Sequence, residues 1–286
     1  MKKIIITTTF RDFNGNINDK MQIQFLKSLK RQTYQNYVLV VTLFREKNVE
    51  ATVKKILGEK AVFVCSTISS KYRYSPTKVI MSGIDYGKEA GADILIDCSA
   101  DIILQNNFLQ TVVNYYSSMY CGISHPNIFY GINNKFEIVD KRVGECNRGI
   151  DIRFFDFSLI ANKNVCRILK KYTLFDWGGI EHLLAVICMK YSKRMINIFD
   201  ESKVIKFEND REASKESKEY ITRSSQKNSK VLLDVAQAMK IDESKLFDLY
   251  YIHLQYSEPR YVSAIYILRK ELWRKVMYFY GKLKNV

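Results

Sequence analysis

Two aspartates close a hydrophobic stretch of the chain and are its best-placed groups for chemistry. Asp97 and Asp101 lie in the run ADILIDCSAD at residues 92–101. A carboxylate at the end of a buried strand is costly unless something pairs with it. A divalent cation bridging a diphosphate is such a partner, because Mg²⁺ and Mn²⁺ prefer carboxylate and phosphate oxygens. The run therefore indicates a cation site; the alternative is that Asp101 caps the next helix and Asp97 caps a turn.

The elements that must position these carboxylates alternate strictly between strands and helices. Apolar runs rich in β-branched residues predict strands at 3–9, 37–44, 61–66 and 92–99. Amphipathic spacing and capping residues predict helices at 18–31, 48–57, 77–90 and 107–120. This order predicts an α/β fold with a mostly parallel sheet flanked by helices. In such folds, ligands bind beyond the carboxyl ends of the strands.

Two segments carry a resemblance to a known family. The first is FLKSLKRQTYQNYVLVV at residues 25–41, and the second is TKVIMSGIDYGKEAGADILIDCSAD at residues 77–101. In order and spacing they resemble the donor half of a GT-A-fold glycosyltransferase close to family 2. That family has a phrase of the form SLxxQTYxNxE and an acidic signature of the form DxD. The acidic signature of this chain, DCSAD, is longer.

The resemblance implies a Rossmann-like GT-A sheet, a nucleotide-sugar donor and Mn²⁺ or Mg²⁺ as cofactor. Asp97 matches the first aspartate of the family signature, and Asp101 matches the last if one residue is inserted. The resemblance also places further residues at the donor. These are Thr8, Thr9 and Arg11 beside the nucleoside, Glu46 near the base, and Lys78 facing the diphosphate.

A second acidic segment, FDWGGIEHLLAV at residues 175–186, resembles the family's acceptor site. There a Gly-rich turn precedes an acidic residue that takes the proton from the acceptor hydroxyl. The resemblance makes Glu181 the first candidate for the general base, Asp176 the second and His182 the third. The alternative is that Glu181 only occupies the first turn of a helix, where the helix dipole favours a carboxylate.

The domain prediction divides the chain at two places. Residues 1–200 are expected to form the catalytic domain, with a donor half at about 1–120 and an acceptor half at about 121–200. Residues 201–228 are charged and poor in large apolar groups, which predicts a linker. Residues 229–286 are expected to form a helical C-terminal extension. Its last part, 261–286, has the pattern of a basic amphipathic helix, which either binds an anionic membrane or packs on protein.

Composition restricts the class of function. The formal net charge of +15 favours anionic partners. The six cysteines lack zinc-site spacing, which favours free thiols in a reducing cytoplasm. The sequence contains no run of about 20 apolar residues, which is the length that would predict a membrane span. The chain is thus expected to be cytoplasmic, with peripheral binding to the inner membrane face as an option.

The predicted function is transfer of a sugar from a nucleotide-diphosphate donor to a glycan or lipid-linked glycan of the cell surface, with inversion. Two other classes compete with it. A sugar nucleotidyltransferase normally has a Gly-rich basic loop after its first strand, whereas TTTFRDFNGN has only one glycine and one arginine. A nucleic-acid-binding module would interleave basic and aromatic residues in a known motif, and no such motif is present. No nucleic-acid partner is therefore expected.

Overall fold

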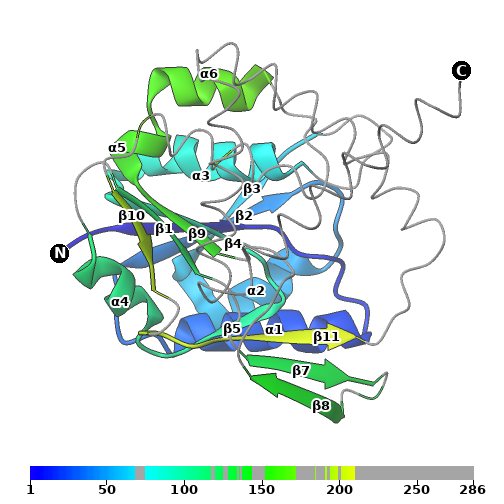
Figure 1. The fold of residues 1–286 in the computed structure, drawn as a ribbon. Coiled ribbons are helices and arrows are strands. Elements are labelled where there is room, and N and C mark those ends of the chain that lie inside the picture. The colour runs from blue at the N-terminus through cyan, green and yellow to red at the C-terminus, as the bar shows by residue number, and fades with distance from the viewer. Residues whose placement is uncertain are drawn as a thin grey trace, which may run out of the picture.

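A computed structural model of the chain describes residues 1–67, 75–116, 120–124, 128–133, 135, 137–143, 152–171, 184, 191, 194–198 and 201–209 (Figure 1). The helices are α1 (Ile17–Lys30), α2 (Val49–Leu57), α3 (Pro76–Ala90), α4 (Phe108–Asn114), α5 (Phe157–Ile160) and α6 (Lys163–Lys171), with a 3-10 turn at Gly58–Lys60. The larger sheet contains β1 (Ile4–Thr8), β2 (Tyr37–Leu43), β3 (Ala61–Cys65), β4 (Ile94–Cys98), β6 (Tyr120–Ser124), β9 (Ile152–Asp156) and β10 (Arg194–Asn197). The smaller sheet contains β5 (Ile102–Leu104), β7 (Ile128–Ile132), β8 (Ile138–Val143) and β11 (Val204–Asn209).

Within the described residues, the larger sheet has the strand order β10-β6-β9-β4-β1-β2-β3. All of its strands run parallel except β9, which is antiparallel to both β4 and β6. The smaller sheet has the order β5-β11-β7-β8. This arrangement confirms the predicted α/β fold with a mostly parallel sheet flanked by helices.

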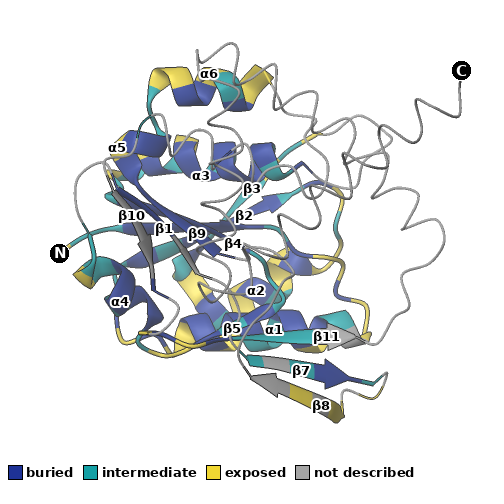
Figure 2. Ribbon diagram, viewed as in Figure 1, coloured by how far each residue is buried: buried dark blue, intermediate teal, exposed yellow. Residues whose placement is uncertain are grey.

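Helices cover both faces of the larger sheet, as Figure 2 shows by the burial of their inner sides. On one face, α1, α2 and α4 pack on alternate strand residues such as Ile4, Ile6 and Leu39. On the other face, α3, α5 and α6 pack on the intervening residues, among them Ile5 and Leu95. The strands are apolar on both sides because both sides are covered.

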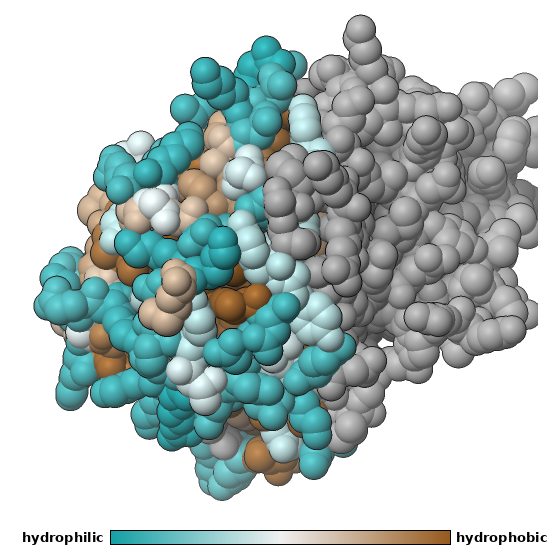
Figure 3. Space-filling model, turned by 90° about the vertical axis from the view of Figure 1, so that its left-hand side faces the viewer, coloured by the Kyte–Doolittle hydropathy of each residue, from teal (hydrophilic) through white to brown (hydrophobic). Residues whose placement is uncertain are grey.

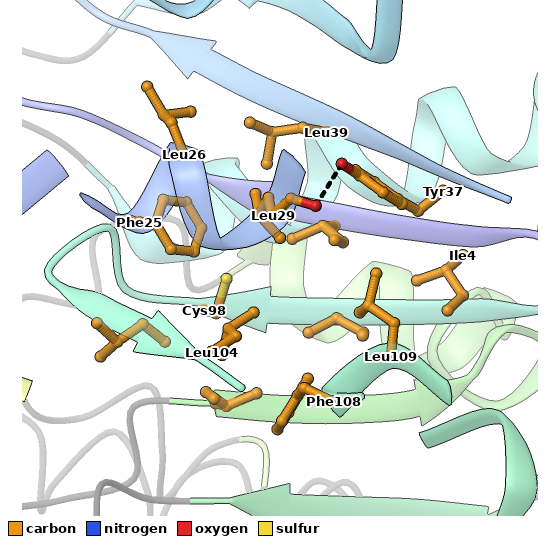
Figure 4. Packing of buried hydrophobic residues seen from close by; sticks show 14 of the residues in the cluster. Ile4, Phe25, Leu26, Leu29, Tyr37, Leu39, Cys98, Leu104, Phe108 and Leu109 are labelled. Carbon is orange, nitrogen blue, oxygen red and sulfur yellow. Dashed lines mark hydrogen bonds between the residues drawn. The ribbon is translucent and has the colours of Figure 1, made fainter. Parts of the chain in front are cut away.

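A buried tyrosine links the first helix to the second strand in the core (Figure 4). The hydroxyl of Tyr37 donates a hydrogen bond of 2.8 Å to the carbonyl oxygen of Leu29 near the end of α1. Burial raises the pKa of Tyr37 to about 12. The phenol therefore stays neutral, and its hydrogen bond adds to the one that the Leu29 carbonyl oxygen accepts from the Gln32 N–H at 3.1 Å.

The first half of the chain follows the predicted elements closely, with small shifts at their ends. Asn16, rather than Asn18, caps α1, and its side chain accepts from the N–H groups of residues 18 and 19. Gly58 and Gly91 end α2 and α3 with positive φ, where glycine avoids steric strain. The helix predicted at 107–120 ends at Asn114, because Tyr120 already begins β6.

The predicted linker at 201–228 is wrong for its first part. Residues 204–209 form β11, which pairs antiparallel with β5 and parallel with β7. Charged residues are tolerated there because only one side of the strand needs an apolar partner. The predicted remainder of the linker, at 210–228, and the predicted C-terminal extension at 229–286 lie outside the described residues.

The surface gives little sign of a broad apolar face in the described part of the chain. Figure 3 shows one side of the molecule, on which hydrophilic residues dominate and hydrophobic ones appear as separate patches. Among the described helices, none is long and apolar enough to cross a bilayer.

Candidate functional site

The strand order identifies the crevice where a ligand is expected. The chain passes from β1 to β2 and β3 through α1 and α2 on one face, and then returns to β4 through α3 on the other face. The direction of winding therefore reverses between β1 and β4, which are neighbours. Open α/β sheets bind ligands at such a switch point, beyond the carboxyl ends of the strands. Here those ends are Thr8 in β1 and Cys98 in β4.

Three successive threonines tie the end of β1 to its surroundings. The Thr7 hydroxyl donates to the carbonyl oxygen of Val79 in α3 at 2.7 Å, and the Thr8 hydroxyl donates to that of Cys98 at 2.7 Å. The Thr9 hydroxyl donates to the carbonyl oxygen of Thr42 in β2 at 2.9 Å. The structure thus places Thr8 and Thr9 at the switch point, where their hydroxyls hold the strand ends together.

Asp97 lies inside β4 instead of following it. It is paired in register with Arg153 of the antiparallel strand β9, and the Arg153 Nε atom is 3.0 Å from an Asp97 carboxylate oxygen. Both residues are buried, with relative exposures of 7% and 8%. Arg153 thus supplies the positive charge that a buried carboxylate requires. The sequence prediction left this partner out.

Asp101 has a different environment, in the turn between β4 and β5. One of its carboxylate oxygens is 3.7 Å from the ammonium nitrogen of Lys206 in β11. Its other oxygen, Oδ1, is buried and receives no hydrogen bond in the described part of the chain. A buried acceptor without a donor is costly, so this oxygen is suited to bind a ligand atom.

The fold of this chain is similar to that of solved structures. No family model and no curated protein matches the chain. Residues 1–349 of S. aureus TarS in complex with UDP superpose with a TM-score of 0.54 and 10% identity, over 90% of this chain and 73% of that one. The longer S. aureus TarS structure superposes with a TM-score of 0.52 and 9% identity, over 90% of this chain and 43% of that one. TarS is a GT-A-type glycosyltransferase.

This chain has the GT-A fold. The resemblance expected from residues 25–41 and 77–101 is therefore confirmed at the level of the fold. A cytidylyltransferase from Leptospira borgpetersenii aligns over 60% of the chain with a TM-score of only 0.34, which carries no argument for the rival class. At these identities the comparison concerns the fold alone.

In this GT-A fold, the two predicted metal ligands differ in how well they suit a cation. Asp101 fits, because its Oδ1 atom is buried without a hydrogen-bond donor. Asp97 does not fit, because the cross-strand partner Arg153 already neutralises its carboxylate. The described residues contain no group of three or more His, Cys, Asp or Glu side chains arranged for a metal. A cation here would take most of its ligands from phosphate and water, as Mg²⁺ commonly does.

The loops after β1 and β2 of the GT-A sheet form one connected rim. The backbone N–H of Lys47 donates to Asp12 at 2.6 Å, and the Asn48 side chain donates to the carbonyl oxygen of Phe13 at 3.2 Å. Glu46 accepts from the N–H groups of Phe44 and Arg45 at 2.7 and 3.1 Å. The structure therefore gives the Glu46 carboxylate a role in closing its own turn.

Arg11 and Lys78 stand at opposite sides of this edge. Arg11 is exposed, and its backbone is held by the Gln22 side chain, which accepts from its N–H at 2.6 Å. Lys78, in the first turn of α3, donates to the carbonyl oxygen of Thr67. Of these two cations, Arg11 is thus exposed to solvent, whereas Lys78 ties α3 to the segment after β3.

The predicted acceptor residues Glu181, Asp176 and His182 lie outside the described residues. Sequence reasoning missed Arg153 and Lys206, the cations that face the two aspartates. A signal for Arg153 existed: it is the one charged residue in the apolar run IRFF at 152–155. A single charge in a buried run implies a buried opposite charge.

Proposed function

We propose that the chain is a glycosyltransferase that moves a sugar from a nucleotide-diphosphate donor to a hydroxyl of a cell-surface glycan. The candidate products are capsule, O-antigen or lipooligosaccharide, and the proposed transfer is a single inverting displacement. The observation that carries the proposal is Asp101, whose buried, undonated oxygen lies at the switch point of a GT-A sheet. The UDP bound to TarS in the superposed structure supports a nucleotide as the leaving group of the donor.

Each part of the site has a distinct task in this proposal. The rim formed by the loops at 10–15 and 44–48 holds the nucleoside, with Thr8 and Thr9 keeping the strand ends in place. Arg11 contacts the donor from the solvent side. Asp101 would hold Mn²⁺ or Mg²⁺, which when bound stabilises negative charge on the departing diphosphate. Asp97 forms an ion pair with Arg153 and so holds β9 against β4.

The residues that we propose for the acceptor chemistry lie outside the described part of the chain. Glu181 is proposed as the general base that removes the acceptor proton, with Asp176 and His182 as the next candidates. Replacing Glu181 with Gln should abolish transfer and slow donor hydrolysis, in which water is the acceptor that loses the proton, while nucleotide binding stays intact. If His182→Asn alone stops transfer, the roles of the two residues are exchanged.

The deciding experiment is nucleotide-induced thermal stabilisation. UDP, GDP and CMP are each added with Mn²⁺, and the matching nucleotide should raise Tm, because a ligand at a hundredfold excess over its Kd adds about 2.7 kcal/mol to stability. The Asp101→Asn variant should lose this shift. Asp85→Asn, an exposed aspartate on α3, is the matched control and should retain it.

A screen of nucleotide-sugar hydrolysis, with and without Mn²⁺, then identifies the donor without knowledge of the acceptor. Absence of any nucleotide effect in the wild type, together with stabilisation by RNA, would favour a nucleic-acid-binding module. Release of pyrophosphate from a nucleoside triphosphate and a sugar phosphate would favour the nucleotidyltransferase class.

A further inference from the structure

A groove of about 640 Å³ lies between α1 and α2, on the outer side of the layer that these helices form. Both helices turn their buried residues toward the sheet, so the groove is separate from the core. Several lining residues, Lys30 and Arg31 among them, lie at the end of α1, where the chain turns back to begin β2. That end is at the opposite edge of the sheet from the candidate donor site, because α1 runs antiparallel to the strands it connects.

All of the charged side chains that line the groove are basic. Four cationic side chains line it, and no carboxylate does; they are Lys27, Lys30, Arg31 and Lys55. In the described part of the chain none of the four makes an ion pair. The acidic residue of α2, Glu50, is engaged by Lys54 at 2.6 Å. Four positive charges therefore converge on one concave surface without compensation by the protein.

The floor of the groove is aliphatic. Ile23 and Ile56 are partly buried against the core cluster, and Ala51 also lines the groove. No aromatic side chain lines the groove, so it offers no stacking platform for a nucleic-acid base. An aliphatic floor surrounded by cations matches a ligand with a negative head joined to a hydrocarbon chain.

The chain's own C-terminal segment is a poor occupant. Residues 261–286 contain six basic residues and one acidic residue, so they carry the same sign of charge as the groove. We propose instead that the groove binds the headgroup of an acidic phospholipid and docks the protein on an anionic membrane surface. The phosphate lies among the four cations, and the first methylene groups lie on Ile23 and Ile56. This goes beyond the proposed function and does not depend on it.

The test is co-sedimentation of the full chain with phosphatidylcholine vesicles, with and without phosphatidylglycerol. The variant is Lys27→Gln/Lys55→Gln. The matched control is Lys163→Gln/Lys170→Gln, which removes the same charge from exposed positions of α6 on the other face of the sheet. Each basic residue near an anionic surface contributes about fivefold to binding, so the groove variant should lose roughly 30-fold and the control less than about threefold.

A second readout distinguishes a lipid from a free anion. Short-chain dioctanoyl phosphatidylglycerol should compete with vesicle binding at concentrations where glycerol phosphate and inorganic phosphate do not, because only the lipid uses the aliphatic floor. Equal losses in the groove and control variants would overturn the proposal, as would equal competition by inorganic phosphate or displacement by single-stranded RNA. Binding that survives in the groove variant but disappears on deletion of residues 261–286 would overturn it as well. Equal Tm values of both variants and the wild type confirm that the fold is intact.

Discussion

Two aspartates four residues apart have different partners, and the partners define their roles. Arg153 neutralises Asp97 within the sheet, whereas Asp101 keeps one buried oxygen without a donor at the turn. A residue that is fully paired by its own fold contributes to stability. A residue with unsatisfied polar capacity at a crevice is available to a ligand. Asp97 therefore contributes to stability, and Asp101 is available to a ligand.

The buried pair leads to a prediction about stability. Asp97→Asn should lower the free energy of unfolding by about 3–5 kcal/mol, because the buried Arg153 guanidinium loses its ion pair with the Asp97 carboxylate. The double variant Asp97→Asn/Arg153→Met should recover part of this loss, since it removes both charges. Urea denaturation of Asp97→Asn, Arg153→Met and the double variant measures the coupling. Strictly additive losses would contradict the pairing.

At the scale of elements, the contact between α3 and the sheet depends on a glycine. A Cβ atom at Gly83 would lie 2.9 Å from the Cβ atom of Thr7 and 2.9 Å from a methyl group of Leu95. Both neighbours belong to central strands that are fixed on both sides. The close approach brings the Val79 carbonyl within reach of the Thr7 hydroxyl, which helps to hold the end of β1 at the site.

Gly83→Ala should therefore destabilise the protein by about 1–3 kcal/mol, the usual cost of overpacking a core. It should also reduce nucleotide-induced stabilisation, because β1 and α3 would separate. Ser82→Ala, at the adjacent and half-buried position of the same helix, is the control and should leave both quantities nearly unchanged. Thermal and urea unfolding, with and without nucleotide, provide the measurement.

The start of β1 is tied to the start of β4 through Asp93. Its carboxylate accepts from the Lys3 N–H at 2.7 Å and from the Lys2 ammonium group at 3.0 Å. Burial by itself would raise the pKa of Asp93, but these two donors outweigh burial and the pKa lies below its ordinary value of 3.8. This interaction aligns the two strands that flank the switch point.

Because the folded-state pKa of Asp93 is lowered, its contribution to stability is complete above the ordinary aspartate pKa. The contribution is lost as the pH falls through the lower folded-state value. The difference in unfolding free energy between the wild type and Asp93→Asn should thus be constant near neutral pH and shrink below about pH 4. A difference that grows with acidification would contradict the assigned hydrogen bonds. Urea titrations at several pH values test this.

At the scale of the whole molecule, attraction through the net charge of +15 should respond to salt differently from binding at the candidate donor site. The Debye length falls from about 30 Å at 0.01 M to about 8 Å at 0.15 M ionic strength. Vesicle binding through the α1–α2 groove should therefore weaken strongly over this range. Nucleotide-induced stabilisation should change much less, since its contacts are short and partly buried. A parallel decline of both would mean that the nucleotide is held only by general attraction to a basic protein.

Local sequence alone specified much of the donor half. The strands and helices from Ile4 to Cys98 were predictable within a few residues, because apolar periodicity, Asn and Ser caps, and glycines at helix ends are local signals. The order of these elements also implied a parallel sheet, since a helix that crosses over a face of the sheet brings the next strand back in the same direction. The importance of Asp97 and Asp101 was visible as charge at the end of an apolar run.

Only the tertiary structure decided which of those aspartates is paired by the protein itself. Arg153 is more than fifty positions from Asp97 in the sequence, and β9 meets β4 because its direction reverses within the sheet. Lys206 reaches Asp101 through β11, a strand whose charged residues suggested a linker. Long-range pairing depends on register and strand direction, which depend on the whole packed sheet and not on any local window. The roles of the two aspartates therefore emerge only when the distant strands come together.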